Sequence, residues 1–185
     1  MTTKYHYDCE FLENGKTIDL ISIGIVCEDG REFYAVSSEF DTQAVAQHWW
    51  LMKNVMPSIE HIEFLNANPV TGMPVKDFLV TDKATMTRKR IRDGILDFVD
   101  GTTPEFWNWY GAYDHVALCQ LFGKMIDLPS HFPMFSCDIK MLHKAAGYCE
   151  MPKQPAGLHN ALADAKFNVV RYEYLTKLLS LEKQR

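Results

Sequence analysis

The sequence predicts an α/β fold in which a mixed sheet is flanked by helices on both faces. Three strand-like segments come first, at residues 4–11, 17–27 and 31–38, and the Asp29-Gly30 pair before the third is typical of a hairpin turn. Further along the chain, helical and strand-like segments alternate. An antiparallel meander followed by strand–helix units indicates a mixed sheet.

The later elements are predicted from the same two periodicities and from turn signals. They are a helix capped by Asp41 or Thr42 that carries Val45, Trp49 and Met52 and stops before Pro57, an irregular excursion over 58–84, a helix over 85–99, a strand over 105–110, a helix over 114–122, a short fifth strand over 135–137, a helix over 138–146, a loop over 151–160 and a long helix over 161–181. We expect the four tryptophans, Trp49, Trp50, Trp107 and Trp109, in the core.

Length and composition are those of one globular domain over residues 1–185. The chain is 47% hydrophobic and 23% charged, which excludes a disordered protein. Its net charge of −5 argues against a sequence-blind DNA-coating protein but allows a nucleic-acid enzyme with a local basic patch. Five cysteines without a CxxC pair disfavour a disulfide framework. With no signal peptide and no membrane-length apolar run, we expect a cytoplasmic protein without a membrane partner.

The first strand places two carboxylates on one face. Alternation separates a core face from a second face with His6, Asp8 and Glu10. The core face carries Tyr5, Tyr7, Cys9 and Phe11, and on the next strand Ile21, Ile23 and Ile25 are expected to share a face. Two buried like charges need compensation, so a divalent metal site is one interpretation, and a salt-bridged or solvated pair is the other.

Two further segments carry candidate polar groups, and each has a plain structural alternative. Asp114 lies where the 105–110 strand gives way to a helix, which suits a site at a strand end but equally suits a helix N-cap. Asn160 is a plausible N-cap, which places His159 just before the final helix and Asp164 within its second turn. An acid there is also favoured by the helix dipole alone.

Taken together, these segments resemble a known family. The motifs DCE (8–10), GAYDHVAL (111–118) and HNALADA (159–165) are similar to the three motifs of the DEDDh 3′–5′ exonucleases of the ribonuclease-H-like superfamily. The run that begins DCEFLENGKTIDL, with WNWYGAYDHVALCQL, resembles the mycobacterial polyadenylate-specific 3′-exoribonuclease subgroup. The chain departs from most of the family by Phe11 and Leu12 in place of a Thr-Gly pair, and by Asn108 lying six residues before Asp114.

The resemblance implies a fold and a mechanism. The fold is ribonuclease-H-like, a five-stranded mixed sheet of order 3-2-1-4-5 flanked by helices. The activity is hydrolysis of RNA from its 3′ end, with adenylate-rich tails as substrate and nucleoside 5′-monophosphates as products. Two Mg²⁺ ions, or Mn²⁺ as a substitute, are held by Asp8, Glu10, Asp114 and Asp164, and His159 is the general base. Phe11 and Leu12 contact the terminal nucleotide, and the expected partners are a single-stranded RNA 3′ end and a second copy of the chain.

Two alternatives stay open at this point. One is a DEDDh exonuclease acting on single-stranded DNA or on RNA ends of any sequence, and the other is a non-catalytic RNA-binding module. A basic cluster over residues 83–92 has the right sign for a phosphate backbone but is also typical of a solvated helix face. Its members are Lys83, Arg88, Lys89, Arg90 and Arg92.

Overall fold

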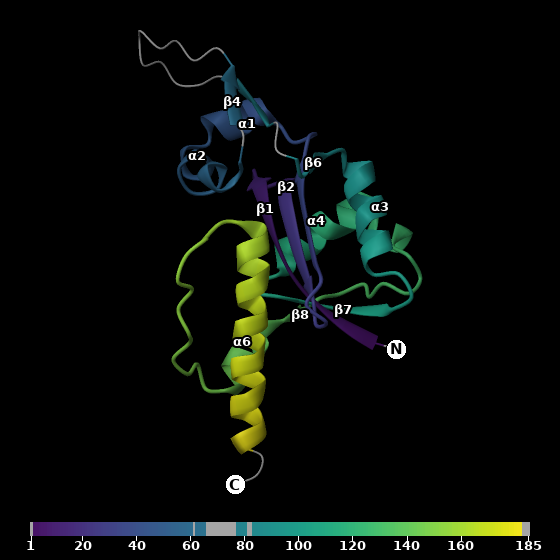
Figure 1. Cartoon of the computed structure of the whole chain (residues 1–185), viewed down its shortest axis with the longest axis vertical. Helices are drawn as coiled ribbons and strands as arrows, with labels where there is room; N and C mark the ends of the chain where they lie inside the picture. The colour runs from purple at the N-terminus through teal and green to yellow at the C-terminus, as the bar shows by residue number, and fades with distance from the viewer. Residues whose placement is uncertain (1, 61, 66–76, 81–82, 183–185) are drawn as a thin grey trace.

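The computed structural model describes residues 2–60, 62–65, 77–80 and 83–182. Figure 1 shows a central sheet with the long helix α6 in front of it and α4 behind it. The elements are β1 (Thr2–Glu13), β2 (Ile18–Cys27), β3 (Glu32–Ser37), α1 (Thr42–Gln47), α2 (Trp49–Asn54), η1 (Met56–Ser58), β4 (Ile62–Leu65), β5 (Asp77–Val80), β6 (Thr85–Met86), α3 (Arg88–Phe98), β7 (Thr103–Asn108), α4 (Ala112–Phe122), η2 (Met125–Asp127), β8 (Cys137–Asp138), α5 (Ile139–Ala145) and α6 (Ala161–Glu182).

The central sheet is mixed and has six strands in the order β6-β3-β2-β1-β7-β8. The expected order of five strands recurs as β3-β2-β1-β7-β8, but the expectation of five strands is wrong. Thr85 and Met86 were expected to begin a helix; instead they form β6, which pairs in parallel with the end of β3. The helix α3 starts only at Arg88, because the hydroxyl of Thr87 accepts the N–H of Arg90 and caps it there.

The helix expected from residue 42 is interrupted at His48. His48 has an extended backbone, and its Nδ1 accepts the N–H of Leu51, so it ends α1 and caps α2. The break changes the direction of the apolar stripe, and Trp49 and Trp50 are 72% and 36% exposed although both were expected in the core. Trp107 and Trp109, expected there too, are half-buried. Asp41 caps α1, as one of the two expected caps. Part of the expected irregular segment is the antiparallel pair β4–β5, and residues 61, 66–76 and 81–82 of it lie outside the described residues.

Both faces of the central strand β1 are covered. Tyr5, Tyr7 and Cys9 are buried in the main core against α3 and α4, as alternation predicted, and α6 packs on the opposite face. A register shift between Glu10 and Phe11 leaves an extra residue, Ile21, in β2. Ile21 therefore joins a second core cluster beneath α1 and α2, and the expectation that it shares a face with Ile23 and Ile25 is wrong.

Within the described part of the chain, no helix has the length and apolar character that crossing a membrane requires. All five cysteines lie in that part and are free thiols, as expected from the sequence.

Candidate metal centre

Three of the predicted acids lie together where β1 meets α6. Asp8 and Glu10 project from the face of β1 that α6 covers, and Asp164 lies at the start of α6. Each contributes a carboxylate oxygen, and these oxygens all lie within 4.8 Å of one another. Glu10 and Asp164 are buried and Asp8 is half-buried. Residues more than 150 positions apart in the sequence thus form one acidic cluster, which the motif pattern predicted.

A glycine on β2 allows α6 to come this close. Gly24 pairs with Asp8 across the β1–β2 ladder. A methyl group at Gly24 would lie 2.4 Å from the Cα and N of Leu162 and 2.5 Å from the carbonyl carbon of Ala161. Only a residue without a side chain fits there, so Gly24 sets the distance between Asp164 and the acids of β1. The sequence offered no signal for this role, because strand glycines have several uses.

Burial and mutual repulsion raise the pKa values of the carboxyl groups in the cluster. Burial, with the neighbouring carboxylates Asp114, Glu10 and Asp164, raises the pKa of Asp8 well above its ordinary range. Burial and the charges of Asp164 and Asp114 raise the pKa of Glu10 to about 8. Burial also raises the pKa of Asp164. Carboxylates in such a site stay ionised near neutral pH when a cation joins them, and oxygen ligands of this kind suit Mg²⁺ or Mn²⁺.

Asp114 approaches the same strand from the other helix layer. It lies buried in the first turn of α4, and its Oδ1 accepts the N–H of Cys9 at 2.7 Å, between the two acids of β1. Gly111 occupies the N-cap position of α4, so the alternative of Asp114 as a simple N-cap is wrong. Burial raises the pKa of Asp114 to about 7, while the bond from Cys9 opposes the rise. Asp114 is thus a neighbour of Asp8, but it is not part of the three-residue group defined by the 4.8 Å distance.

His159 precedes α6 in the predicted loop. Asn160 caps the helix as predicted, since its Oδ1 accepts the N–H of Ala163. The backbone of His159 is left-handed, with φ of 62°, and its carbonyl accepts the Ser58 hydroxyl at 2.6 Å. Its ring lies edge-on to the ring of Trp50, with the ring centres 4.8 Å apart. The charge of His159 lowers the pKa of Asp164, so the imidazole lies within electrostatic reach of the cluster.

Two residues of α6 that the sequence analysis missed support the acids. The side-chain amide of Asn168, fully buried, donates to the carbonyl of Tyr7, one residue before Asp8. Arg171 donates to the Asn168 Oδ1 at 2.7 Å, and its charge lowers the pKa of both Asp8 and Asp164. The spacing of 164, 168 and 171 places all three on one helix face, and this periodicity could have found them.

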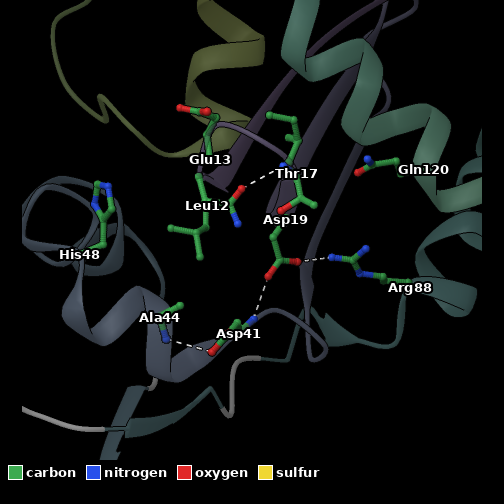
Figure 2. Close-up of a pocket in the computed structure, with 11 residues that line it drawn as sticks. Leu12, Glu13, Thr17, Asp19, Asp41, Ala44, His48, Arg88 and Gln120 are labelled. Carbon is green, nitrogen blue, oxygen red and sulfur yellow. Dashed lines mark hydrogen bonds and ion pairs between the residues drawn. The ribbon is translucent and has the colours of Figure 1, made fainter.

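Phe11 and Leu12 lie in apolar surroundings. The Phe11 ring packs against the main core and edge-on to Tyr113, with the ring centres 6.0 Å apart. Leu12 is buried in the second core cluster and lines a cavity of about 690 Å³ beyond the end of β1 (Figure 2). The predicted contact of these two residues with a terminal nucleotide stays a prediction.

The cavity shown in Figure 2 carries more acid than base. Glu13, Asp19 and Asp41 line it, and its basic residue Arg88 is paired with Asp19. Other members of the predicted basic cluster are also paired, because Lys89 and Arg92 both contact Asp93. The solvated-face interpretation therefore fits this cluster better than a phosphate-binding surface does.

Comparison with known proteins identifies relatives of the whole chain. No protein-family model matches it. Two curated proteins of Mycobacterium tuberculosis, one from strain CDC 1551 / Oshkosh and one from strain ATCC 25618 / H37Rv, are each 40% identical to it over 176 residues. The match covers 94% of this chain and 93% of each relative, and both relatives are named 3′–5′ exoribonuclease.

Proposed function

The chain belongs to the family of these two mycobacterial 3′–5′ exoribonucleases, and on that premise we propose that it hydrolyses RNA from the 3′ end with the help of two divalent metal ions. Each cycle forms a bond between a water oxygen and the phosphorus of the last phosphodiester. It breaks the bond from that phosphorus to the 3′ oxygen of the preceding nucleotide, and a nucleoside 5′-monophosphate leaves.

The acidic cluster is the observation that carries this proposal. Three carboxylates whose oxygens lie within 4.8 Å, with Asp114 beside them, provide hard oxygen ligands with a net negative charge. Their raised pKa values fit a site that is completed by cations, because repulsion between the carboxylates is unrelieved without them. A module that only binds RNA has no use for buried acids that repel phosphate.

Asp8, Glu10, Asp164 and Asp114 are the residues that would hold the ions. When bound, such ions lower the pKa of the attacking water and stabilise the charge on the phosphate. His159 accepts the proton of that water at its imidazole, and Trp50 restricts the orientation of the ring. Phe11 and Leu12 would lie beside the terminal nucleotide.

The finer assignments are part of the same proposal. The order of the acids, with His159 five positions before Asp164, supports membership of the DEDDh group. The strand order β3-β2-β1-β7-β8 with α6 on β1 supports a ribonuclease-H-like fold. Adenylate-rich tails are the substrate that the sequence resemblance favours. A homodimer and a cytoplasmic location, both expected from the sequence, stay predictions, and sedimentation velocity tests the first.

The test uses RNA oligomers with A, C, G or U tails and a DNA oligomer with an A tail. Each is incubated with the protein in Mg²⁺ or in EDTA, beside Asp164→Asn and a control, Glu173→Gln, that removes an exposed carboxylate from the same helix. We expect stepwise loss from the 3′ end of the A tail in Mg²⁺, abolished by EDTA and by Asp164→Asn but not by Glu173→Gln. Equal trimming of all RNA tails would reject the adenylate preference, and preferred trimming of DNA would reject the RNA substrate. Absence of trimming of every oligomer in Mg²⁺ would reject the proposed activity.

A further inference from the structure

An aromatic surface with one basic residue lies on the β7–α5 side of the acidic cluster. We define the Lys140 surface as Trp109, Tyr110, Lys140 and Tyr148. The Lys140 ammonium lies 4.4 Å from the ring centre of Trp109 and 4.9 Å from that of Tyr110. Tyr110 and Tyr148 are 63% and 61% exposed, so their rings are open to a ligand. The surface joins stacking rings to a positive charge.

The surface is continuous with the acidic cluster. The ring of Trp109 also contacts the Arg171 guanidinium at 4.8 Å, and the charge of Arg171 acts on Asp8 and Asp164. β7, which leads directly to Trp109 and Tyr110, pairs in parallel with β1. An RNA strand that extends from the acidic cluster across Trp109 therefore reaches the Lys140 surface first.

The backbone holds both exposed tyrosines in an unusual conformation. Tyr110 and Tyr148 have left-handed φ angles of 60° and 57°. The N–H of Tyr110 donates to Asp138 Oδ1, and the N–H of Tyr148 donates to the carbonyl of His143. Bulky side chains rarely adopt this conformation, and such strain concentrates at functional sites. The structure thus fixes two large rings in solvent rather than burying them.

A lysine without an ion pair among the described residues distinguishes this side of the site from the opposite one, where Arg88 is paired with Asp19. Among the described residues, Lys140 forms no ion pair, and its ammonium lies 3.2 Å from His143 Nδ1. The cavity beyond Leu12 is lined instead by Glu13, Asp19 and Asp41, which repel phosphates. A terminal nucleotide needs a bounded pocket, whereas the rest of the strand needs an open surface that attracts its backbone.

We infer that the Lys140 surface binds single-stranded RNA on the 5′ side of the bond that is cleaved. Lys140 meets a backbone phosphate, and the rings of Tyr110 and Tyr148 stack on bases. This inference rests on the proposed function and adds to it the path of the strand outside the catalytic centre.

Substrate length tests the inference. A diribonucleotide, ApA, has only the scissile phosphate, whereas an adenylate oligomer of about twelve nucleotides reaches beyond the acids. We would measure kcat/KM for both in Mg²⁺ with Lys140→Ala, Lys140→Arg and Tyr110→Asn, since asparagine tolerates the left-handed backbone. Lys144→Ala, an exposed lysine one turn along α5, is the matched control.

We expect Lys140→Ala and Tyr110→Asn to lower kcat/KM on the oligomer about tenfold, and on ApA far less. Lys140→Arg should restore most of the loss, and Lys144→Ala should change neither substrate. In a salt titration with the oligomer, Lys140→Ala should reduce the slope of log(kcat/KM) against log[salt] by about 0.7, the value for one phosphate contact on a single strand. Equal losses on both substrates, or a Lys140→Ala protein that matches Lys144→Ala, would overturn the inference.

Failure of the proposed function has a different result, because the wild-type protein would then release no 5′-monophosphate from either substrate. In that case, fluorescence anisotropy of the labelled oligomer in EDTA still measures RNA binding by the Lys140 surface. Weaker binding by Lys140→Ala and Tyr110→Asn, but not by Lys144→Ala, supports it, and binding by these three variants equal to that of the wild type rejects it.

Discussion

Gly24→Ala is expected to move the acids of the site apart while it leaves the sheet paired. The added methyl group would lie 2.4 Å from backbone atoms of Leu162 and 2.5 Å from a backbone atom of Ala161. Carbon atoms in contact need about 3.5 Å, so the start of α6 must retreat by roughly 1 Å. Asp164 lies in that first turn, and its distance from Asp8 and Glu10 would increase with the retreat.

The loss of stability is large because the new methyl group clashes with backbone atoms rather than with the end of a side chain. Overpacking of this type costs about 1–3 kcal/mol. Alanine lowers the conformational entropy of the unfolded chain relative to glycine, and this offsets about 0.5–1 kcal/mol of the cost. The net loss of up to about 2.5 kcal/mol, at about 2–4 °C per kcal/mol in a chain of this length, should lower Tm by up to about 10 °C. Activity should fall further, because a misplacement of about 1 Å in a catalytic group can cost about 100-fold.

The assay compares three quantities in Gly24→Ala and Gly94→Ala: kcat/KM on an A-tailed RNA, the affinity for Mn²⁺ by calorimetry, and Tm by scanning fluorimetry. Gly94 lies in α3, where the nearest atom to a new methyl group belongs to the side chain of Phe33 rather than to α6. We expect Gly94→Ala to keep its activity and metal affinity. If Gly24→Ala also kept both, the idea that this glycine sets the position of Asp164 would be refuted.

Three further predictions concern the charges and rings of the site. The pKa of Glu10 is about 8 in the folded protein against an ordinary 4.5, so the metal-free protein should lose stability as pH rises from about 4.5 to about 8. Glu10→Gln in EDTA should therefore raise Tm at pH 8 by several degrees and change it little at pH 4.5. A lower Tm of the variant at pH 8 would contradict this prediction. His159→Asn should lower kcat about 100-fold, because the general base is lost. Tm should be unchanged, because asparagine accepts the left-handed backbone. Single-turnover rates and melting curves measure the two quantities, and near-normal turnover would remove His159 from the mechanism. Trp50→Ala should lower kcat about tenfold, because the His159 ring loses the contact that orients it. Trp49→Ala, at the exposed neighbouring position, serves as the control. Equal rates in the two variants would show that the Trp50–His159 contact does not affect turnover.

Local rules predicted the parts of the site that depend on them. Alternation along β1 correctly separated Tyr5 and Tyr7 from Asp8 and Glu10, because that strand is covered on both faces and its period is undisturbed up to Glu10. The cap at Asn160 was predicted because a capping side chain acts within three residues of itself.

Features that depend on tertiary pairing were missed. The extra residue Ile21 belongs to a register between two strands, which one strand's pattern does not show. The strand β6 has two residues and exists only because β3 lies beside it. The exposure of Trp49 follows from the break at His48, where the sequence gives no sign that a helix ends. Gly24 acts through a contact between α6 and the sheet, so its role appears only in three dimensions, whereas Arg171 shares a helix face with Asp164 and could have been found from that spacing.

The position of α6 also has a consequence for the time at which the site can form during protein synthesis. β1 supplies Asp8 and Glu10 near the start of the chain, and α6 supplies Asp164 after every other described element has been made. A ribosome-bound chain that ends before Ala161 lacks Asp164 and the helix that covers β1, so it can neither complete the acidic cluster nor bury it. On the proposed function, the nascent protein therefore has no competent nuclease centre until α6 has been made.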